Sequence, residues 1–192
     1  LVAERRAEAE RLPDGPAVHV AFVGIERAGL VAVGIGARAG VQEIAHIVRR
    51  SGAAMLISQD ELRGRSMEAL LEELASLGGP LREQGAIPDL MERPDWGDGF
   101  TPEHPPLPEP DPDALFLINS TSGTTGMPKC VMHTQNRWFY FHQLAAAAGR
   151  FGADEVFMGA VPAPFGLGLW TAHFSPVALG VPTVLLPRFD AG

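Results

Sequence analysis

Residues 117–134 read LINSTSGTTGMPKCVMHT, in which two apolar runs enclose a segment of glycine, serine and threonine that ends in one lysine. The first run (114–121) has the composition of a strand, and the second (129–134) is typical of its partner. We therefore predict a hairpin-like turn with the glycine-rich segment at its tip. An ordinary flexible turn would explain the glycines, but not Lys129 after Pro128 or four hydroxyl residues in five consecutive positions.

The composition of this loop suits a polyphosphate. Glycine accepts positive φ and has no Cβ, so backbone N–H groups can turn toward phosphate oxygens. Hydroxyl groups add hydrogen-bond donors, and a lysine adds a mobile cation. The residues that we expect to contact phosphate are Thr121, Ser122, Gly123, Thr124, Thr125, Gly126 and Lys129.

The Walker A motif, G-x-x-x-x-G-K-[ST], does not fit this loop. Lys129 does not follow a glycine, and Cys130 stands where the Walker motif needs a hydroxyl for the metal ion. A Walker loop also opens a helix, whereas the residues after Cys130 continue a strand. The sequence thus predicts a phosphate loop of another kind.

Helical and strand patterns alternate on both sides of the loop, which predicts an α/β fold with layered parallel or mixed sheets flanked by helices. The helix at 17–28 is almost entirely apolar and is expected to be buried on most sides. Ser66 is a candidate N-cap and Gly52 a candidate helix stop. Helices are predicted at 1–12, 17–28, 41–52, 66–77, 136–149 and 167–179, and further strands at 30–35, 53–58, 155–161 and 182–187.

Residues 80–113 differ in character, because they contain nine prolines and repeated acidic residues without periodicity. We interpret them as a surface excursion, since such a segment buries too little apolar surface to order itself. The predicted organisation is a first α/β portion (1–79), this excursion, and a second α/β portion (114–192) that carries the loop, all within one larger domain.

Composition excludes several classes of protein. A net charge of −8 argues against a nucleic-acid surface, and the single cysteine, Cys130, cannot form a disulfide within the chain. No apolar stretch has the length of a membrane span, and the N-terminus is unlike a signal peptide, so a cytoplasmic location is expected. Because the chain opens on Leu1 and ends just after a predicted strand, we expect a piece of a longer protein.

The loop resembles a known signature. TSGTTGMPKCV (121–131) meets every position but one of the pattern T-S-G-T-T-G-x-P-K-G-V, which marks the adenylate-forming (AMP-forming) superfamily of acyl- and aryl-CoA synthetases, luciferases and peptide-synthetase adenylation domains. The stretches 22–57, 161–170 and 180–191 look like further segments of acyl-CoA synthetases. The resemblance covers most of residues 13–191 apart from the excursion.

The resemblance implies the N-terminal portion of the large domain of that fold and a reaction in two halves. A carboxylic acid attacks MgATP to give an acyl-adenylate and pyrophosphate, and the thiol of coenzyme A then displaces AMP. The loop would hold the β- and γ-phosphates, with Lys129 as the catalytic cation. Phe165 and Gly166 would line an apolar pocket for an aryl, alicyclic or fatty acid, as in fatty acid metabolism; Phe165 as a plain core residue is the alternative.

Three departures qualify the resemblance. Cys130 replaces a glycine, either as an inert buried thiol or as a reactive one whose pKa the neighbouring Lys129 lowers. The segment 34–39, GIGARA, stands where proline and asparagine are usual, and the strand that normally precedes 12–19 is not recognisable. The superfamily's adenine, magnesium and ribose motifs belong to later sequence. We therefore expect this piece alone not to adenylate.

Histidines and aromatic residues carry weaker signals. His133, His142 and His173 lack metal-ligand spacing, so no metal site is predicted. The consecutive aromatics 138–141 face around a helix and are interpreted as core.

Two alternatives to an acid–CoA ligase stay open: an adenylating enzyme that loads a carrier-protein thiol, and a non-catalytic degenerate nucleotide-binding protein.

Overall fold

A computed structural model describes residues 7–11, 15–78, 83–86, 109, 111–121 and 126–186. Its main feature is a six-stranded sheet in the order β6-β3-β1-β2-β7-β8. All neighbouring strands are parallel except β8, which pairs antiparallel with β7. The predicted α/β class is confirmed, and the sheet, which was expected to be parallel or mixed, is mixed. The strands are β1 (Ala7–Arg11), β2 (Val31–Gly34), β3 (Met55–Ser58), β6 (Glu83–Ala86), β7 (Leu115–Ser120) and β8 (Cys130–Thr134).

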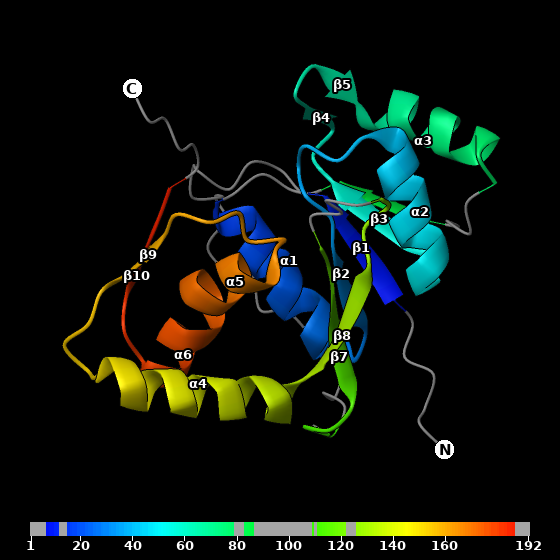
Figure 1. Ribbon diagram of the computed structural model, residues 1–192. Helices are drawn as coiled ribbons and strands as arrows, with labels where there is room; N and C mark the ends of the chain where they lie inside the picture. Colours follow the sequence, from blue (N-terminus) through cyan, green and yellow to red (C-terminus); the bar gives the residue numbers. More distant parts are fainter. Residues whose placement is uncertain are drawn as a thin grey trace, which may run out of the picture.

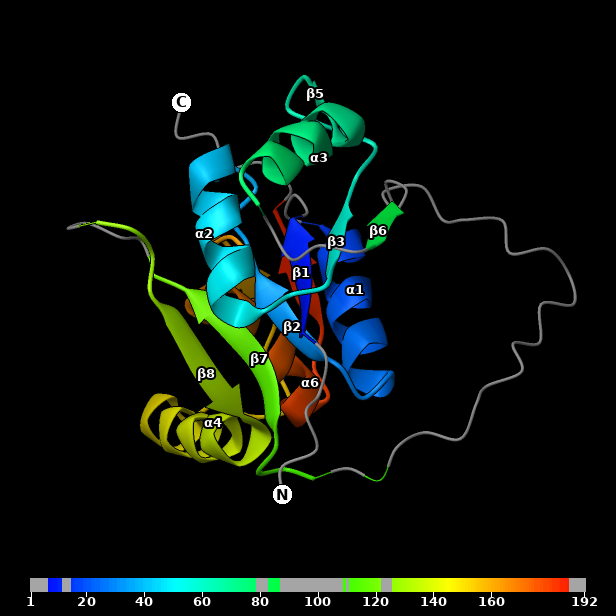
Figure 2. The same cartoon turned by 90° about the vertical axis from the view of Figure 1, so that its right-hand side faces the viewer.

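Helices cover both faces of this sheet (Figure 1). On one face lie α2 (Val41–Ser51) and α3 (Met67–Ser76), and on the other lie α1 (Pro16–Arg27) and the helical segment of residues 166–179. Figure 2 shows the same two layers from the side, with α4 (Gln135–Gly149) directly after β8. This arrangement confirms the predicted helices at 41–52, 66–77 and 136–149.

Each layer has its own apolar core. Strand β2 contributes to both, because alternate residues of a strand point to opposite faces. Its Val31 and Val33 join the core beneath α2 and α3, whereas Ala32 joins the core beneath α1 and α4. The pairing of β2 with β7 brings Gly34 opposite Asn119, and the strand before the loop lies between β2 and β8 in this sheet.

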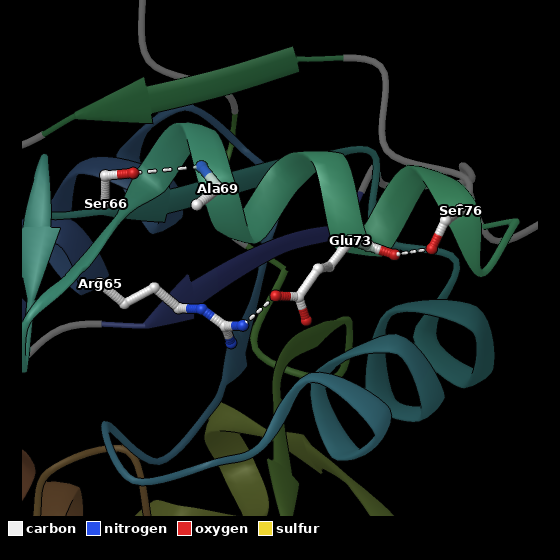
Figure 3. A network of polar contacts seen from close by, with 5 residues as sticks. All are labelled: Arg65, Ser66, Ala69, Glu73 and Ser76. Carbon is white, nitrogen blue, oxygen red and sulfur yellow. Dashed lines mark hydrogen bonds and ion pairs between the residues drawn. The ribbon is translucent and has the colours of Figure 1, made fainter.

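Helix α3 begins as its sequence predicts. The backbone N–H of Ala69 donates to Ser66 Oγ at 3.2 Å, so Ser66 is the N-cap (Figure 3). At the other end, Ser76 Oγ donates to the carbonyl of Glu73 at 2.7 Å. Arg65 forms an ion pair with the Glu73 carboxylate across the exposed side of the helix, a contact that contributes less than about 1 kcal/mol because water screens it. Arg65 and Ser66 form β5, which pairs with β4 (Glu61–Leu62).

The C-terminal part holds a second, two-stranded parallel sheet of β9 (Phe157–Gly159) and β10 (Thr183–Leu185). Between them, the predicted helix at 167–179 is present as α5 (Gly166–Leu169), a π-helical turn η1 (Trp170–Phe174) and α6 (Ser175–Leu179). The predicted strands at 155–161 and 182–187 are confirmed, although both are shorter than expected.

Two predictions fail at strands of the main sheet. Residues 7–11 form β1 rather than part of a helix, and residues 83–86 form β6 within the expected excursion. In both cases backbone pairing with neighbouring strands overrides side-chain composition, because ladder hydrogen bonds need no particular side chains. β1 ends directly before residues 12–19, where the resemblance showed no recognisable strand. Residues 1–6, 12–14, 79–82, 87–108, 110, 122–125 and 187–192 lie outside the described part.

Two predictions of burial are also wrong. Helix α1 is buried on one face only, since Val20 and Val23 are 55% and 39% exposed. In α4 only Trp138 of the aromatic run is core. Its neighbours in the run, Phe139, Tyr140 and Phe141, are 48%, 63% and 62% exposed, because a helix turns successive side chains to different sides. No helix among the described residues is long and apolar enough to cross a membrane.

Candidate functional site

The loop between β7 and β8 is closed by a double hydrogen bond at its base. The N–H of Thr121 donates to the carbonyl of Lys129 at 3.0 Å, and the N–H of Lys129 donates to Thr121 Oγ1 at 3.1 Å. These bonds follow the last ladder pair, Ser120 with Cys130, so the sheet register continues to the loop. The predicted hairpin is therefore present, and its first hydroxyl residue has a structural task.

The structure describes only part of the predicted phosphate contacts. Ser122, Gly123, Thr124 and Thr125 lie outside the described residues. Thr121, Gly126 and Lys129 are all exposed to solvent. Among the described residues Lys129 has no ion-pair partner, which leaves its ammonium group available to an anion.

Gly126 and Pro128 shape the return of the loop to the sheet. Gly126 has a φ of 155°, a backbone conformation that residues other than glycine rarely adopt. Pro128 is buried, and its carbonyl accepts a hydrogen bond from His46 Nε2 at 3.0 Å. His46 lies on α2, one of the helices that cover the sheet. This helix therefore supports the loop from outside the hairpin.

The surroundings of Cys130 do not favour a reactive thiol. Its side chain is half-buried and packs against the core beneath α2. Burial raises the pKa of the Cys130 thiol, and the positive charge of Arg50 only partly opposes this effect. This does not support the hypothesis that Lys129 lowers the pKa of Cys130, because desolvation dominates and the opposing cation is Arg50.

The predicted acid-pocket residues lie at the start of helix α5, near the carboxyl ends of β2 and β7. Phe165 is half-buried and is the N-cap of α5, and Gly166 is its first residue. The Phe165 ring lies 3.2 Å from the point where a side chain at Gly36 would begin. The carboxyl ends of parallel strands are where α/β folds usually bind ligands, and Gly36 follows such an end of β2.

Asn119 connects this acid-side segment to the loop strand. Its Nδ2 donates to the carbonyl of Pro164 at 3.1 Å, and the residue is 4% exposed. Its Oδ1 has no hydrogen-bond partner among the described residues and lies 3.1 Å from the Cβ position of Gly166. Strand β7, which leads into the predicted phosphate loop, thus also contacts the segment that carries the predicted acid-pocket residues.

Close approach of β2 to the same segment needs a glycine. A Cβ on Gly34 would lie 2.4 Å from the carbonyl oxygen of Pro164, far inside van der Waals contact. Gly34 therefore allows the backbone before Phe165 to rest directly on the sheet. This contact fixes where helix α5 starts.

A separate cavity of about 160 Å³ lies one turn further along the helical segment. Its lining is mainly apolar and includes the acidic residue Glu26, and neither Phe165 nor Gly166 lines it. Gln135 donates to Glu26 beside this cavity. Its lining residues are Phe22, Glu26, Ala32, Phe116, Gln135, Trp138, Phe139, Leu169, His173, Phe174, Val177 and Ala178.

Three histidines are packed against neighbouring side chains. His142 is buried, with Nδ1 3.0 Å from Ser175 Oγ. His173 and His19 face each other with their Nδ1 atoms 3.3 Å apart and their rings nearly parallel at 12°. Burial, reinforced by His173, lowers the pKa of His19 to about 4, and burial also lowers the pKa of His173. The described residues contain no group of three His, Cys, Asp or Glu that could hold a metal ion.

Sequence reasoning did not identify Asn119 or His46. An asparagine in an otherwise apolar strand was a usable signal for Asn119, because a buried amide needs a partner. His46 offered none, since its contact spans 82 residues and depends on the packing of α2 against the loop.

A family model described as "AMP-binding enzyme" matches residues 11–191. The chain belongs to the AMP-binding enzyme family. Within this family it is similar to the salicyl-AMP ligase / salicyl-S-ArCP synthetase of Mycobacterium tuberculosis, with 27% identity over 77% of the chain and 26% of the relative. It is also similar to 4-hydroxybutyrate–CoA ligase 2 of Metallosphaera sedula, with 24% identity over 88% of the chain and 32% of the relative.

Solved structures show the fold of this AMP-binding family member. O-succinylbenzoate coenzyme A synthetase (MenE) from Bacillus subtilis, in complex with AMP, superposes with a TM-score of 0.77, at 21% identity over 97% of the chain and 45% of that protein. ATP-bound MatB from Rhodopseudomonas palustris gives a TM-score of 0.75, at 20% identity over 97% of the chain and 36% of that protein. The fold is therefore that of the N-terminal region of adenylate-forming enzymes, and the chain spans about a quarter to a half of these relatives.

Proposed function

We propose that the chain is the N-terminal part of an ATP-dependent carboxylic acid–CoA ligase, in which the loop Thr121 to Lys129 binds the pyrophosphate portion of ATP. The observation that carries this proposal is the base of the loop, which fixes the backbone of Lys129 while its side chain stays exposed. Membership of the AMP-binding family supports the use of ATP.

The chemistry of the first half-reaction explains what such a loop contributes. A carboxylate oxygen of the acid forms a bond to the α-phosphorus of ATP, and the bond from that phosphorus to the bridging oxygen of pyrophosphate breaks. Negative charge therefore accumulates on the departing pyrophosphate. A preplaced cation such as Lys129, with the hydroxyl and amide donors expected in the loop, meets that charge without reorganising.

Magnesium enters this proposal with the nucleotide. The described residues offer no cluster of carboxylates for it. Mg²⁺ commonly keeps several waters and binds mainly through substrate phosphates. When bound, it would supply further charge neutralisation beside the group that Lys129 contacts.

The acid is proposed to be apolar, of the aryl, alicyclic or fatty class, and to lie against Phe165 and Gly166. Phe165 is half-buried at the start of α5, and Asn119 ties this segment to the strand that leads into the phosphate loop. This geometry supports an acid held close to the α-phosphate. An amino acid substrate is disfavoured because its ammonium group needs a carboxylate partner.

The acceptor in the second half-reaction is proposed to be coenzyme A, with a carrier-protein thiol as the competing possibility. The chain has relatives of both kinds, a CoA ligase and a salicyl-S-ArCP synthetase. Thioester formation assayed with each acceptor separately distinguishes them. Hydrolysis of the adenylate without transfer to either thiol would count against both.

The test of the proposed function is carboxylate-dependent exchange of labelled pyrophosphate into ATP, measured on the natural full-length protein. We expect exchange with a panel of apolar acids and its loss in Lys129→Ala. Absence of exchange with every acid would favour a non-catalytic nucleotide-binding protein, the reading that Cys130 in the signature supports. The 192-residue chain alone is expected to show no exchange, because residues for adenine and ribose are expected in later sequence.

A further inference from the structure

The peptide between Pro128 and Lys129 is held at both of its polar ends. Its carbonyl accepts from His46 Nε2 at 3.0 Å, and its N–H donates to Thr121 Oγ1 at 3.1 Å. The following carbonyl, that of Lys129, accepts from the Thr121 N–H at 3.0 Å. The backbone around Lys129 is therefore fixed by three hydrogen bonds, although the lysine side chain itself is exposed.

These three bonds have two different origins. The two bonds with Thr121 lie within the hairpin, so they fix Lys129 only relative to the other arm of the loop. The bond from His46 comes from α2, which belongs to another layer of the fold. It connects the loop to a helix outside the hairpin, in addition to the pairing of β7 with β2 in the main sheet.

Helix α2 is a rigid source for this donor. The residues on either side of His46, Ala45 and Ile47, are both fully buried, with no exposed surface. A site is held more accurately by a side chain on a packed helix than by one on a loop. Pro128 is buried as well, so its carbonyl needs a donor within the protein.

Bonds to the two ends of one peptide also reinforce each other. A donor at the carbonyl polarises the peptide and makes its N–H a better donor, here toward Thr121. The His46 bond requires a proton on Nε2, because a carbonyl can only accept. Both the neutral Nε2–H tautomer and the imidazolium satisfy this requirement.

We propose that His46 is a positioning residue for the phosphate loop. It holds the Pro128–Lys129 peptide, so the Lys129 side chain extends from a fixed backbone position. The link between this position and pyrophosphate binding rests on the proposed function. The positioning itself is a property of the chain that can be measured without any reaction.

The experiment compares four variants of the full chain with the wild type. His46→Leu and His46→Ala remove the donor, and two removal variants keep the comparison usable if one of them folds poorly. His46→Gln keeps an amide donor of similar reach. The matched control is Arg49→Leu, because Arg49 Nη1 also donates from α2 to a backbone carbonyl, that of Leu77 at 2.9 Å, away from the loop.

Two measurements are made on each variant. Amide hydrogen exchange, resolved by NMR, reports the protection of the Thr121 and Lys129 N–H groups. Calorimetric titration with magnesium pyrophosphate reports the affinity of the loop. In the removal variants we expect both amides to exchange about three to ten times faster and the affinity to fall by a similar factor, as the loss of one hydrogen bond implies. His46→Gln should recover most of the amide protection and most of the affinity. Arg49→Leu should match the wild type in both measurements.

The outcomes separate positioning from function. Equal exchange at Thr121 and Lys129 in His46→Leu and Arg49→Leu would overturn the proposal. Faster exchange spread evenly over β7 would do so too, because it would show general destabilisation. Faster exchange confined to the two loop amides supports it. If the wild type does not bind magnesium pyrophosphate while that local effect is present, the proposed function fails and the positioning role stands.

Discussion

Thr121 and Lys129, eight positions apart in the chain, are joined twice across the base of the loop. One bond runs between their backbones at 3.0 Å, and the other from the Lys129 N–H to Thr121 Oγ1 at 3.1 Å. A threonine that would otherwise count only as a phosphate ligand thus also closes the loop. The same residue connects the end of β7 to the cation proposed to meet pyrophosphate.

Removing the Thr121 hydroxyl tests that connection. Thr121→Val keeps the shape of the side chain but leaves the Lys129 N–H without its side-chain acceptor. We expect affinity for magnesium pyrophosphate to fall roughly threefold to tenfold, with a stability loss of no more than about 1 kcal/mol because the site is exposed. Titration calorimetry and urea unfolding check the two numbers. Thr121→Ser keeps the oxygen and should resemble the wild type; a Ser variant as weak as Val would contradict the explanation.

Glycine substitutions test how the acid-side segment rests on the sheet. Gly34→Ala would place a Cβ 2.4 Å from the carbonyl oxygen of Pro164, so the backbone must shift. We expect a loss of roughly 1–3 kcal/mol in the free energy of unfolding, the usual range for overpacking. Gly24→Ala in the middle of α1 meets nothing within 4 Å and should gain about 0.5–1 kcal/mol. Equal unfolding midpoints for the two variants would refute this explanation.

Alkylation rates test the state of Cys130. Because burial raises the pKa of this thiol, its thiolate fraction at pH 8 is smaller than that of a free cysteine. We expect labelling by iodoacetamide, followed by mass spectrometry, to be slower than for a cysteine-containing peptide and to rise steeply above pH 9. Labelling faster than the peptide, with or without MgATP, would restore the hypothesis of a reactive thiol.

Acid should destabilise the fold through its buried histidines. The pKa of His19 falls from 6.5 to about 4 on folding, so between these values the unfolded chain binds more protons than the folded one. By linkage, the free energy of unfolding rises with pH across this window. The contribution of His19 to stability is therefore present at pH 7 and is lost as the pH falls toward 4. His19→Leu should make the fold less sensitive to acid. The loss of unfolding free energy between pH 7 and pH 4 should be smaller in this variant by on the order of 2 kcal/mol, after allowance for partial exposure of His19. Urea midpoints at pH 7, 6, 5 and 4 measure the difference, and parallel curves for the two proteins would be the contrary result.

Local signals in the sequence predicted the elements around the site well. The Ser66 cap, the hairpin around the loop and the helix that begins near Phe165 each leave a short pattern of capping, glycine or apolar residues. Such patterns reflect interactions between near neighbours. They are therefore readable without knowledge of the packing.

Contacts between distant segments could not be predicted in the same way. The bond from Asn119 to Pro164 spans 45 residues and that from His46 to Pro128 spans 82, so no spacing rule relates the partners. Strand β1 was missed for a related reason. Its place between β2 and β3 comes from backbone pairing, while its side chains have a helical composition.

The aromatic run of α4 shows the limit of composition as a guide to burial. Trp138 is in the core and contacts Phe116 and Phe174 edge to face. Tyr140 and Phe141, aromatic residues of the same run, are mostly exposed. Which face of the helix is covered depends on where α4 lies relative to α6 and β8, and this is decided by the fold rather than by the run itself.

The most direct test of the central claim is titration of the chain with magnesium pyrophosphate, comparing wild type, Lys129→Met and Lys129→Arg. The exposed position of Lys129 predicts unchanged unfolding midpoints in both variants. If the loop binds pyrophosphate through this cation, Lys129→Met should weaken affinity by about tenfold or more and Lys129→Arg by less, with binding that declines as salt is added. Wild type and Lys129→Met binding with equal affinity, or no binding by the folded wild type, would contradict the account.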